Sequence, residues 1–73
     1  MSQTVMLTKM KNNIKQLRKQ AGLRQEDMAQ LLGVTRQTII AIEKDKYNPS
    51  LELTLKIACL LKKPVEDIFT LEY

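Results

Sequence analysis

A single glycine, Gly33, separates two short segments whose apolar residues recur at helical spacing, and this arrangement constrains the fold more than any other feature. In the stretch LLGVTRQTIIAIEK the glycine directly follows the first pattern, where a residue that accepts positive φ ends a helix and turns the chain sharply. Thr35 is a good N-cap for a new helix. The sequence therefore predicts two short helices joined by a tight turn, over residues 25–32 and 36–44.

Further helices follow from the same spacing. Apolar positions three and four residues apart predict a first helix over residues 12–21, capped by Asn12 or Asn13 and ended by Gly22. The segment KDKYNPS predicts a loop, after which Ser50 caps a fourth helix near residues 51–62. The apolar arc of that helix is wider than a surface helix needs, so the helix is either central to the fold or in contact with another subunit. Pro64 suits the first turn of a last short helix.

Both ends of the chain have strand-like segments. FTLEY alternates apolar and polar residues, and TVMLTKM has strand-like composition, so a two-stranded pairing of the termini is one option. Because 73 residues support only one core, we expect a single all-α domain of five helices, with this small sheet as an optional addition.

The residue inventory disfavours an enzyme. The chain has no histidine and one cysteine, so the usual zinc sites and the commonest catalytic base are absent, and we expect no cofactor and no metal. Cys59 lies in KIACLLK, where we expect it to be buried on a helix. Neither a secretory signal nor a membrane span is indicated, which predicts a cytoplasmic protein without a membrane partner.

Charge is distributed unevenly along the sequence. Residues 9–46 carry nine Lys and Arg against four Asp and Glu, whereas residues 47–73 carry three against four. A basic N-terminal half suggests a face that meets a polyanion, although a merely solvated basic surface has the same composition.

The helix over residues 36–44 begins with three hydrogen-bonding side chains and then turns apolar. A helix that enters the major groove of DNA needs polar side chains in its first turn and an apolar face that fixes it to the domain. Arg36 can reach the O6 and N7 of guanine, Gln37 the N6 and N7 of adenine, and Thr38 polar atoms or a thymine methyl. Ile40 and Ala41 would lie near the same surface. The alternative is an ordinary helical hairpin in a small bundle.

The segment LRKQAGLRQEDMAQLLGVTRQTIIAIEKDKYNPSLELTLKIACLLKKPVEDIF resembles the Cro/C1-type (XRE family) helix-turn-helix repressors over nearly the whole chain. The matching features include Gln25 at the start of the second helix, Ala29 where two helices cross, Gly33 in the turn and NPSLE before the fourth helix. It looks most like the short stand-alone members without a sensor domain, among them a cytolysin-operon repressor whose termini form a small sheet.

This resemblance implies a five-helix, lambda repressor-like DNA-binding domain that binds a palindromic operator in double-stranded DNA as a homodimer. We expect an N-terminal arm or strand over residues 1–11, the helix-turn-helix domain over residues 12–69, and a C-terminal strand or dimer-contact tail over residues 70–73. Arg18 and Glu43 match a buried ion pair between the first and third helices. Arg36, Gln37 and Ala41 match the family's base-facing positions, and we expect Thr38 and Ile40 at the same surface. The phosphate-contacting positions that the resemblance implies are Gln25, Thr35, Lys44, Lys46, Tyr47 and Asn48, and Arg24 is a further candidate for a phosphate contact.

Some expectations stay open at this point. The apolar C-terminal residues Ile68, Phe69, Leu71 and Tyr73 are either core residues or a dimer contact, and we favour the dimer contact. Arg24 departs from the family's Ser or Thr cap, so the second helix should be less well capped. The main alternative function is a protein-interaction module, such as an antitoxin or anti-repressor, on the same scaffold. We expect no small-molecule effector.

Overall fold

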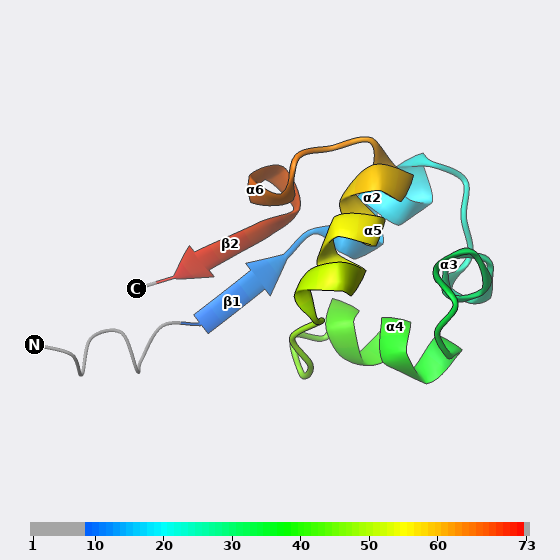
Figure 1. Cartoon of the computed structure of the whole chain (residues 1–73), viewed down its shortest axis with the longest axis horizontal. Helices are drawn as coiled ribbons and strands as arrows, with labels where there is room; N and C mark the ends of the chain where they lie inside the picture. The colour runs from blue at the N-terminus through cyan, green and yellow to red at the C-terminus, as the bar shows by residue number, and fades with distance from the viewer. Residues whose placement is uncertain (1–8, 73) are drawn as a thin grey trace, which may run out of the picture.

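The computed structural model describes residues 9–72, and this part of the chain forms five helices with a small sheet. In chain order the elements are β1 (Lys9–Asn12), α2 (Ile14–Gln20), α3 (Gln25–Leu32), α4 (Arg36–Glu43), α5 (Leu51–Leu61), α6 (Val65–Ile68) and β2 (Phe69–Glu72). Figure 1 shows the helices gathered into one body, with the two strands extending from it side by side. The predicted five-helix fold is confirmed.

The local signals for the helix ends act as predicted. Gly22 and Gly33 follow α2 and α3 with φ of 75° and 73°, in the left-handed region that glycine enters without strain. The hydroxyl oxygen of Thr35 accepts a hydrogen bond from the backbone N–H of Thr38 at 3.3 Å, and that of Ser50 accepts one from Leu53 at 3.1 Å. Each hydroxyl therefore caps its helix.

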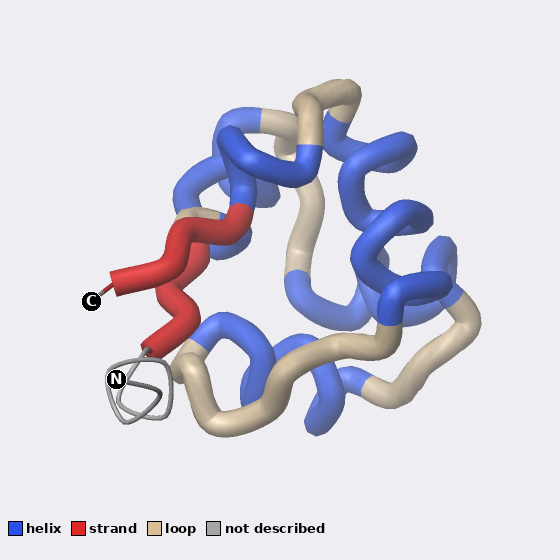
Figure 2. Tube along the Cα trace, turned by 60° about the vertical axis from the view of Figure 1, so that its left-hand side comes forward, coloured by secondary structure: helices blue, strands red, loops and turns tan. Residues whose placement is uncertain are grey.

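The two strands pair antiparallel, with Lys9 opposite Glu72 and Asn12 opposite Phe69 (Figure 2). The expected pairing of the chain ends is therefore present, although residues 4–8 of the expected first strand lie outside the described residues. The prediction that the first helix begins at residue 12 is wrong, because Asn12 belongs to β1. Its side-chain oxygen instead accepts a hydrogen bond from the N–H of Ile14, at 3.1 Å, just inside α2.

One apolar core joins all five helices and β2. Its buried side chains are Ile14, Met28, Ala29, Leu32, Ile39, Ile42, Leu53, Ile57, Leu61, Ile68 and Phe69. Ile57 of α5 is fully buried, and Figure 1 shows α5 in the middle of the helical body. At 25 cal/mol for each Å² of apolar surface removed from water, burial of one such side chain contributes about 1.5 to 3 kcal/mol.

α5 has apolar residues on most of its surface, but only one side of the helix is buried in the core. Leu51 and Leu55 are 74% and 54% exposed, and Cys59 is exposed as well. These three residues repeat at intervals of four, so they share a face of the helix that the core does not cover. The expectation of a buried Cys59 is wrong for this reason.

Two residues expected at a dimer surface lie in the core instead. Ile68 and Phe69 are 1% and 9% exposed within the single chain, so their side chains have almost no surface left for a partner. This corrects their assignment to a dimer contact. Leu71 is exposed, and Tyr73 lies outside the described residues.

None of the helices found between residues 9 and 72 has the length and apolarity that crossing a bilayer requires.

Candidate nucleic-acid interface

α4 is fixed to the core along one side and exposed along the other. Ile39 and Ile42 are each 1% exposed and anchor the helix. Since successive residues are about 100° apart on a helix, the side opposite these two anchors is centred on Gln37. Ile40 and Ala41 are half-buried and flank Gln37 on this outer arc, whereas the exposed Arg36 lies at its border, about 100° before Gln37.

Thr38 lies at the border of this arc, about 100° beyond Gln37. Its hydroxyl oxygen is 3.1 Å from the hydroxyl oxygen of Thr35, and its backbone N–H donates to the same Thr35 oxygen. The two threonines therefore form a local capping pair, and Thr38 has less freedom to meet a base than Gln37 has.

A buried ion pair locks α4 to α2. The Nε of Arg18 donates to Oε2 of Glu43 at 2.7 Å, and its Nη2 donates to Oε1 at 3.3 Å. The two side chains are only 7% and 4% exposed. Arg18 also donates through Nη1 to the backbone oxygen of Leu23, at 2.9 Å. The expected pair is therefore present, and it joins α2, the α2–α3 turn and the end of α4.

Gln25 adds the start of α3 to this network. Its Nε2 donates to Oε1 of Glu43 at 3.2 Å, so one amide N–H has a partner within the chain. The second N–H has no partner among the described residues. Gln25 is half-buried, and its position at the first turn of α3 lets this second N–H serve the phosphate contact expected of it.

Arg24 has no side-chain acceptor and does not cap α3, as predicted. Asp27 compensates in part, because its Oδ2 accepts the backbone N–H of Arg24 at 2.9 Å. The guanidinium also donates to Asp27 and lies 3.3 Å from Glu26. These hydrogen bonds from Arg24 lower the pKa of Asp27 below its ordinary value. A phosphate would have to compete with two carboxylates for Arg24.

The loop after α4 carries the other residues that are expected to contact the DNA backbone. Lys44, Lys46, Tyr47 and Asn48 are all exposed, and within residues 9–72 neither lysine lies in a salt bridge. The loop leaves the helix through Asp45, whose φ of 60° is unusual for a residue with a side chain.

Asn12 supports this turn from a distant part of the sequence. Its Nδ2 donates to the backbone oxygen of Ile42 at 2.8 Å and to Oδ1 of Asp45 at 3.0 Å. It therefore ties the terminal sheet to the C-terminal end of α4. Sequence reasoning treated Asn12 only as a helix cap, because nothing local indicates a contact that spans thirty residues of chain.

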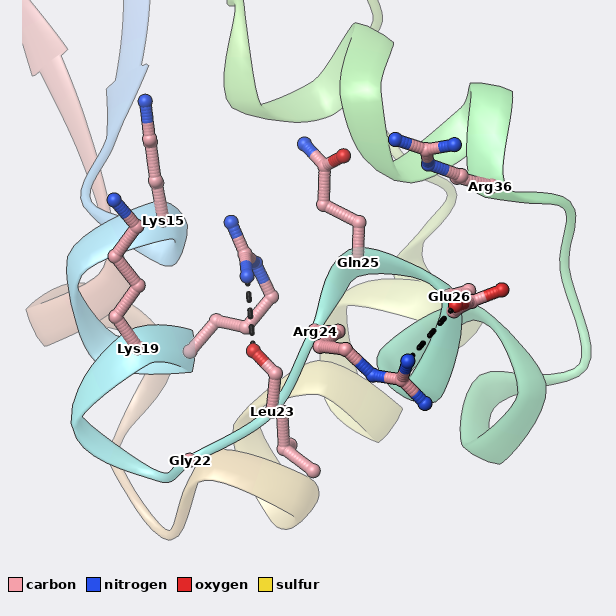
Figure 3. A pocket seen from close by; sticks show the side chains of 9 residues that line it. Lys15, Lys19, Gly22, Leu23, Arg24, Gln25, Glu26 and Arg36 are labelled. Atoms are coloured by element: carbon pink, nitrogen blue, oxygen red, sulfur yellow. Dashed lines mark hydrogen bonds and ion pairs between the residues drawn. The ribbon is translucent and has the colours of Figure 1, made fainter.

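A basic hollow beside α4 also escaped the sequence analysis. It lies between α2 and α3, and Lys15 and Lys19 from α2 face Gln25 from α3 and Arg36 from α4 across it (Figure 3). The two lysines are four residues apart and so share one face of α2. That spacing was visible in the sequence, whereas the approach of α3 and α4 to the same face was not.

Among the described residues, no group of three or more His, Cys, Asp and Glu side chains is placed to hold a metal ion.

Comparison with known proteins identifies relatives over nearly the whole described region. The sequence profile of a family described as Helix-turn-helix matches residues 14–68. An uncharacterized HTH-type transcriptional regulator of Methanocaldococcus jannaschii is 57% identical over 63 residues, which is 86% of this chain and 96% of that protein. One from Bacillus subtilis is 51% identical over 63 residues, with the same shares of the two chains.

Two solved structures share the fold. A Bacteroides fragilis protein proposed to bind DNA superposes with a TM-score of 0.75 at 26% identity, covering 84% of this chain and 98% of that one. The restriction-modification controller protein C.AhdI of Aeromonas hydrophila gives a TM-score of 0.67 at 33% identity, covering 74% and 78%.

Proposed function

The chain belongs to the Helix-turn-helix family of DNA-binding transcriptional regulators, and on that premise we propose that it is a repressor that binds a palindromic operator as a homodimer. α4 lies in the major groove in this proposal. Its first turn and outer arc contact base edges, and the loop after it follows the sugar-phosphate backbone.

The position of Gln37 carries this proposal. Gln37 is exposed and lies opposite the two buried anchors of α4, Ile39 and Ile42. A glutamine amide matches the N6 and N7 edge of adenine with a donor and an acceptor. Arg36 beside it can donate twice to guanine. Ala41 offers only a methyl group, so few direct contacts are available and DNA shape would supply part of the specificity.

Replacing Gln37 by Ala is expected to weaken binding to the preferred duplex by about 1 to 3 kcal/mol, because a bidentate base contact is lost. The loss should fall on one base pair in each half-site, where the variant accepts other bases. Fluorescence anisotropy with a panel of single-base-pair variants of the duplex measures both effects.

Gln30→Ala is the matched control, since Gln30 is also an exposed glutamine but lies on α3. It should leave the base preference unchanged. A uniform loss of affinity across the whole panel for Gln37→Ala would mean that Gln37 does not read a base.

The homodimer is proposed to form through the uncovered face of α5. Leu51, Leu55 and Cys59 make an apolar face on a helix whose other side is already in the core. The exposed Leu71 of β2 adds apolar surface that a partner can cover. For the dimer to reach two successive major grooves, the twofold axis through this contact must set the two copies of α4 about 34 Å apart.

Leu55→Lys is expected to weaken the dimer by about 2 to 3 kcal/mol, because each protomer loses the burial of a half-exposed leucine. Sedimentation equilibrium measures the shift toward monomer, and the affinity for a palindrome should fall more than the affinity for one half-site. Leu31→Lys is the control, because Leu31 is a comparably exposed leucine on α3. Equal dimerisation of Leu55→Lys and the unsubstituted protein would rule out this contact.

Further parts of the proposal follow from the resemblance. The protein is similar to a cytolysin-operon repressor, is located in the cytoplasm and is controlled without a small-molecule effector. Its chain consists of an N-terminal segment up to residue 11, a DNA-binding domain up to residue 69 and a C-terminal tail. The paired strands β1 and β2 support the similarity to the cytolysin-operon repressor, since that repressor was expected to carry such a sheet.

A further inference from the structure

We propose that the basic hollow between α2 and α3 is an additional phosphate-binding site, in which Lys15 and Lys19 hold a phosphate of the DNA backbone beside the bases that α4 reads. This inference rests on the proposed function and extends the DNA contact to α2, a helix outside the helix-turn-helix unit.

The geometry of the hollow suits a small anion that is part of a longer chain. Its volume is about 660 Å³, and it is lined by residues of α2, α3, the turn between them and the first residue of α4. Figure 3 shows the side chains of Lys15 and Lys19 on one side of the hollow and those of Gln25 and Arg36 on the other. These four nitrogen-bearing side chains, from three helices, therefore border one open space.

The charges of the hollow are not balanced within the chain. Among residues 9–72, the salt bridges pair Arg18 with Glu43 and Arg24 with Glu26 and Asp27. Of the described residues that line the hollow, only Glu26 is acidic, and its Oε1 lies 3.3 Å from Nη1 of Arg24. The fourth salt bridge, between Lys56 and Glu52, lies on α5. Within residues 9–72 Lys15, Lys19 and Arg36 therefore keep three positive charges without an acidic partner.

Such a group of like charges favours an anion between them. An incoming phosphate would relieve the mutual repulsion of the cations and accept hydrogen bonds from the two lysine ammonium groups and the Arg36 guanidinium. The rigid network around Glu43 fixes the distance between α2 and α3, because Arg18 and Gln25 both donate to that carboxylate. The hollow is therefore pre-formed.

Arg36 identifies the source of the phosphate as DNA. This residue lines the hollow and also lies at the border of the outer arc of α4, so the two surfaces adjoin there. A DNA strand that bounds the major groove occupied by α4 would pass over the hollow. The three unpaired cations of the hollow, Lys15, Lys19 and Arg36, are exposed, so salt would strongly screen their attraction for a free phosphate ion.

The test compares the salt dependence of DNA binding for the double variant Lys15→Gln/Lys19→Gln with that of the unsubstituted protein. Each neutralised phosphate contributes about 0.9 to the slope of log K against log salt concentration. With one phosphate in the hollow of each protomer, a dimer should lose about 1.8 from this slope, and binding at about 0.1 M salt should weaken roughly tenfold to a hundredfold. The preferred bases should not change.

Lys62→Gln/Lys63→Gln is the matched control, because it removes the same net charge from two exposed lysines after α5. It should change the slope much less than the double variant of α2. Equal slopes for the two double variants would overturn the inference, since the lysines of α2 would then act only through net charge. A protein that prefers no duplex would instead refute the proposed function.

Inorganic phosphate, titrated at constant ionic strength and followed by amide shifts of residues 15–25, separates the two sources. The inference expects no saturable shift in the millimolar range. Saturable binding of inorganic phosphate, combined with an unchanged DNA slope in the variant, would assign the hollow to a free phosphorylated ligand and overturn the DNA contact.

Discussion

Glu43→Ala is expected to destabilise the fold by about 3 to 5 kcal/mol, because it leaves the buried guanidinium of Arg18 without its partner. Glu43 accepts hydrogen bonds from both Arg18 and Gln25, so the same change also removes a partner from α3. A domain of this length has a free energy of unfolding of about 4 to 11 kcal/mol, so the substitution removes a large fraction of the stability. Urea denaturation at fixed protomer concentration measures the change.

Glu52→Ala is the control for this experiment. Glu52 pairs with Lys56 at 3.1 Å on the surface of α5, with side chains 79% and 53% exposed, and such pairs contribute about 0.3 to 0.5 kcal/mol. Arg18→Met/Glu43→Leu removes both buried charges and should cost far less than Glu43→Ala alone. If Glu43→Ala were no more harmful than Glu52→Ala, the ion pair would not be the lock between α2 and α4.

Ile39→Ala is expected to cost about 2 to 5 kcal/mol of unfolding free energy, because Ile39 is 1% exposed and its truncation opens a cavity under α4. The loss of stability comes from the lost burial and not from helix propensity, since alanine favours the helix more than isoleucine does. Thermal and urea denaturation of the free protein measure this loss without DNA.

Ile40→Ala makes the same chemical change at the next position of the same helix. Ile40 is half-buried on the outer arc, so its truncation should cost markedly less stability than that of Ile39. Its effect should appear in DNA affinity instead. Equal losses of stability for the two variants would contradict the assignment of an anchored side and a reading side to α4.

The features that sequence predicted well are local ones. Gly33 requires a positive φ and Thr35 caps the helix two residues later, so neighbouring residues alone determine the turn before α4. The alternation in FTLEY indicated a strand for the same reason. The Arg18–Glu43 pair joins residues 25 positions apart, and only the family resemblance pointed to it.

The features that sequence missed depend on how the helices meet. α5 is apolar on nearly all sides, so periodicity could not decide that Ile57 faces the core while Cys59 faces outward. Apolar residues near a chain end suit either a core or a dimer contact, so the sequence did not show that Ile68 and Phe69 are buried within their own chain. Residues of three helices line the hollow at Lys15 and Lys19. The spacing of the two lysines on α2 does not predict which other helices lie opposite them.

The most direct test of sequence-specific DNA binding is selection of preferred sites by the purified protein from a random duplex library, followed by sequencing. A dimeric repressor should select a palindrome whose half-sites are about 10 bp apart, with bases at which Gln37→Ala relaxes the preference. Weak, salt-sensitive binding without any enriched sequence would contradict it, and a protein-interaction module on the same scaffold would then be the better explanation.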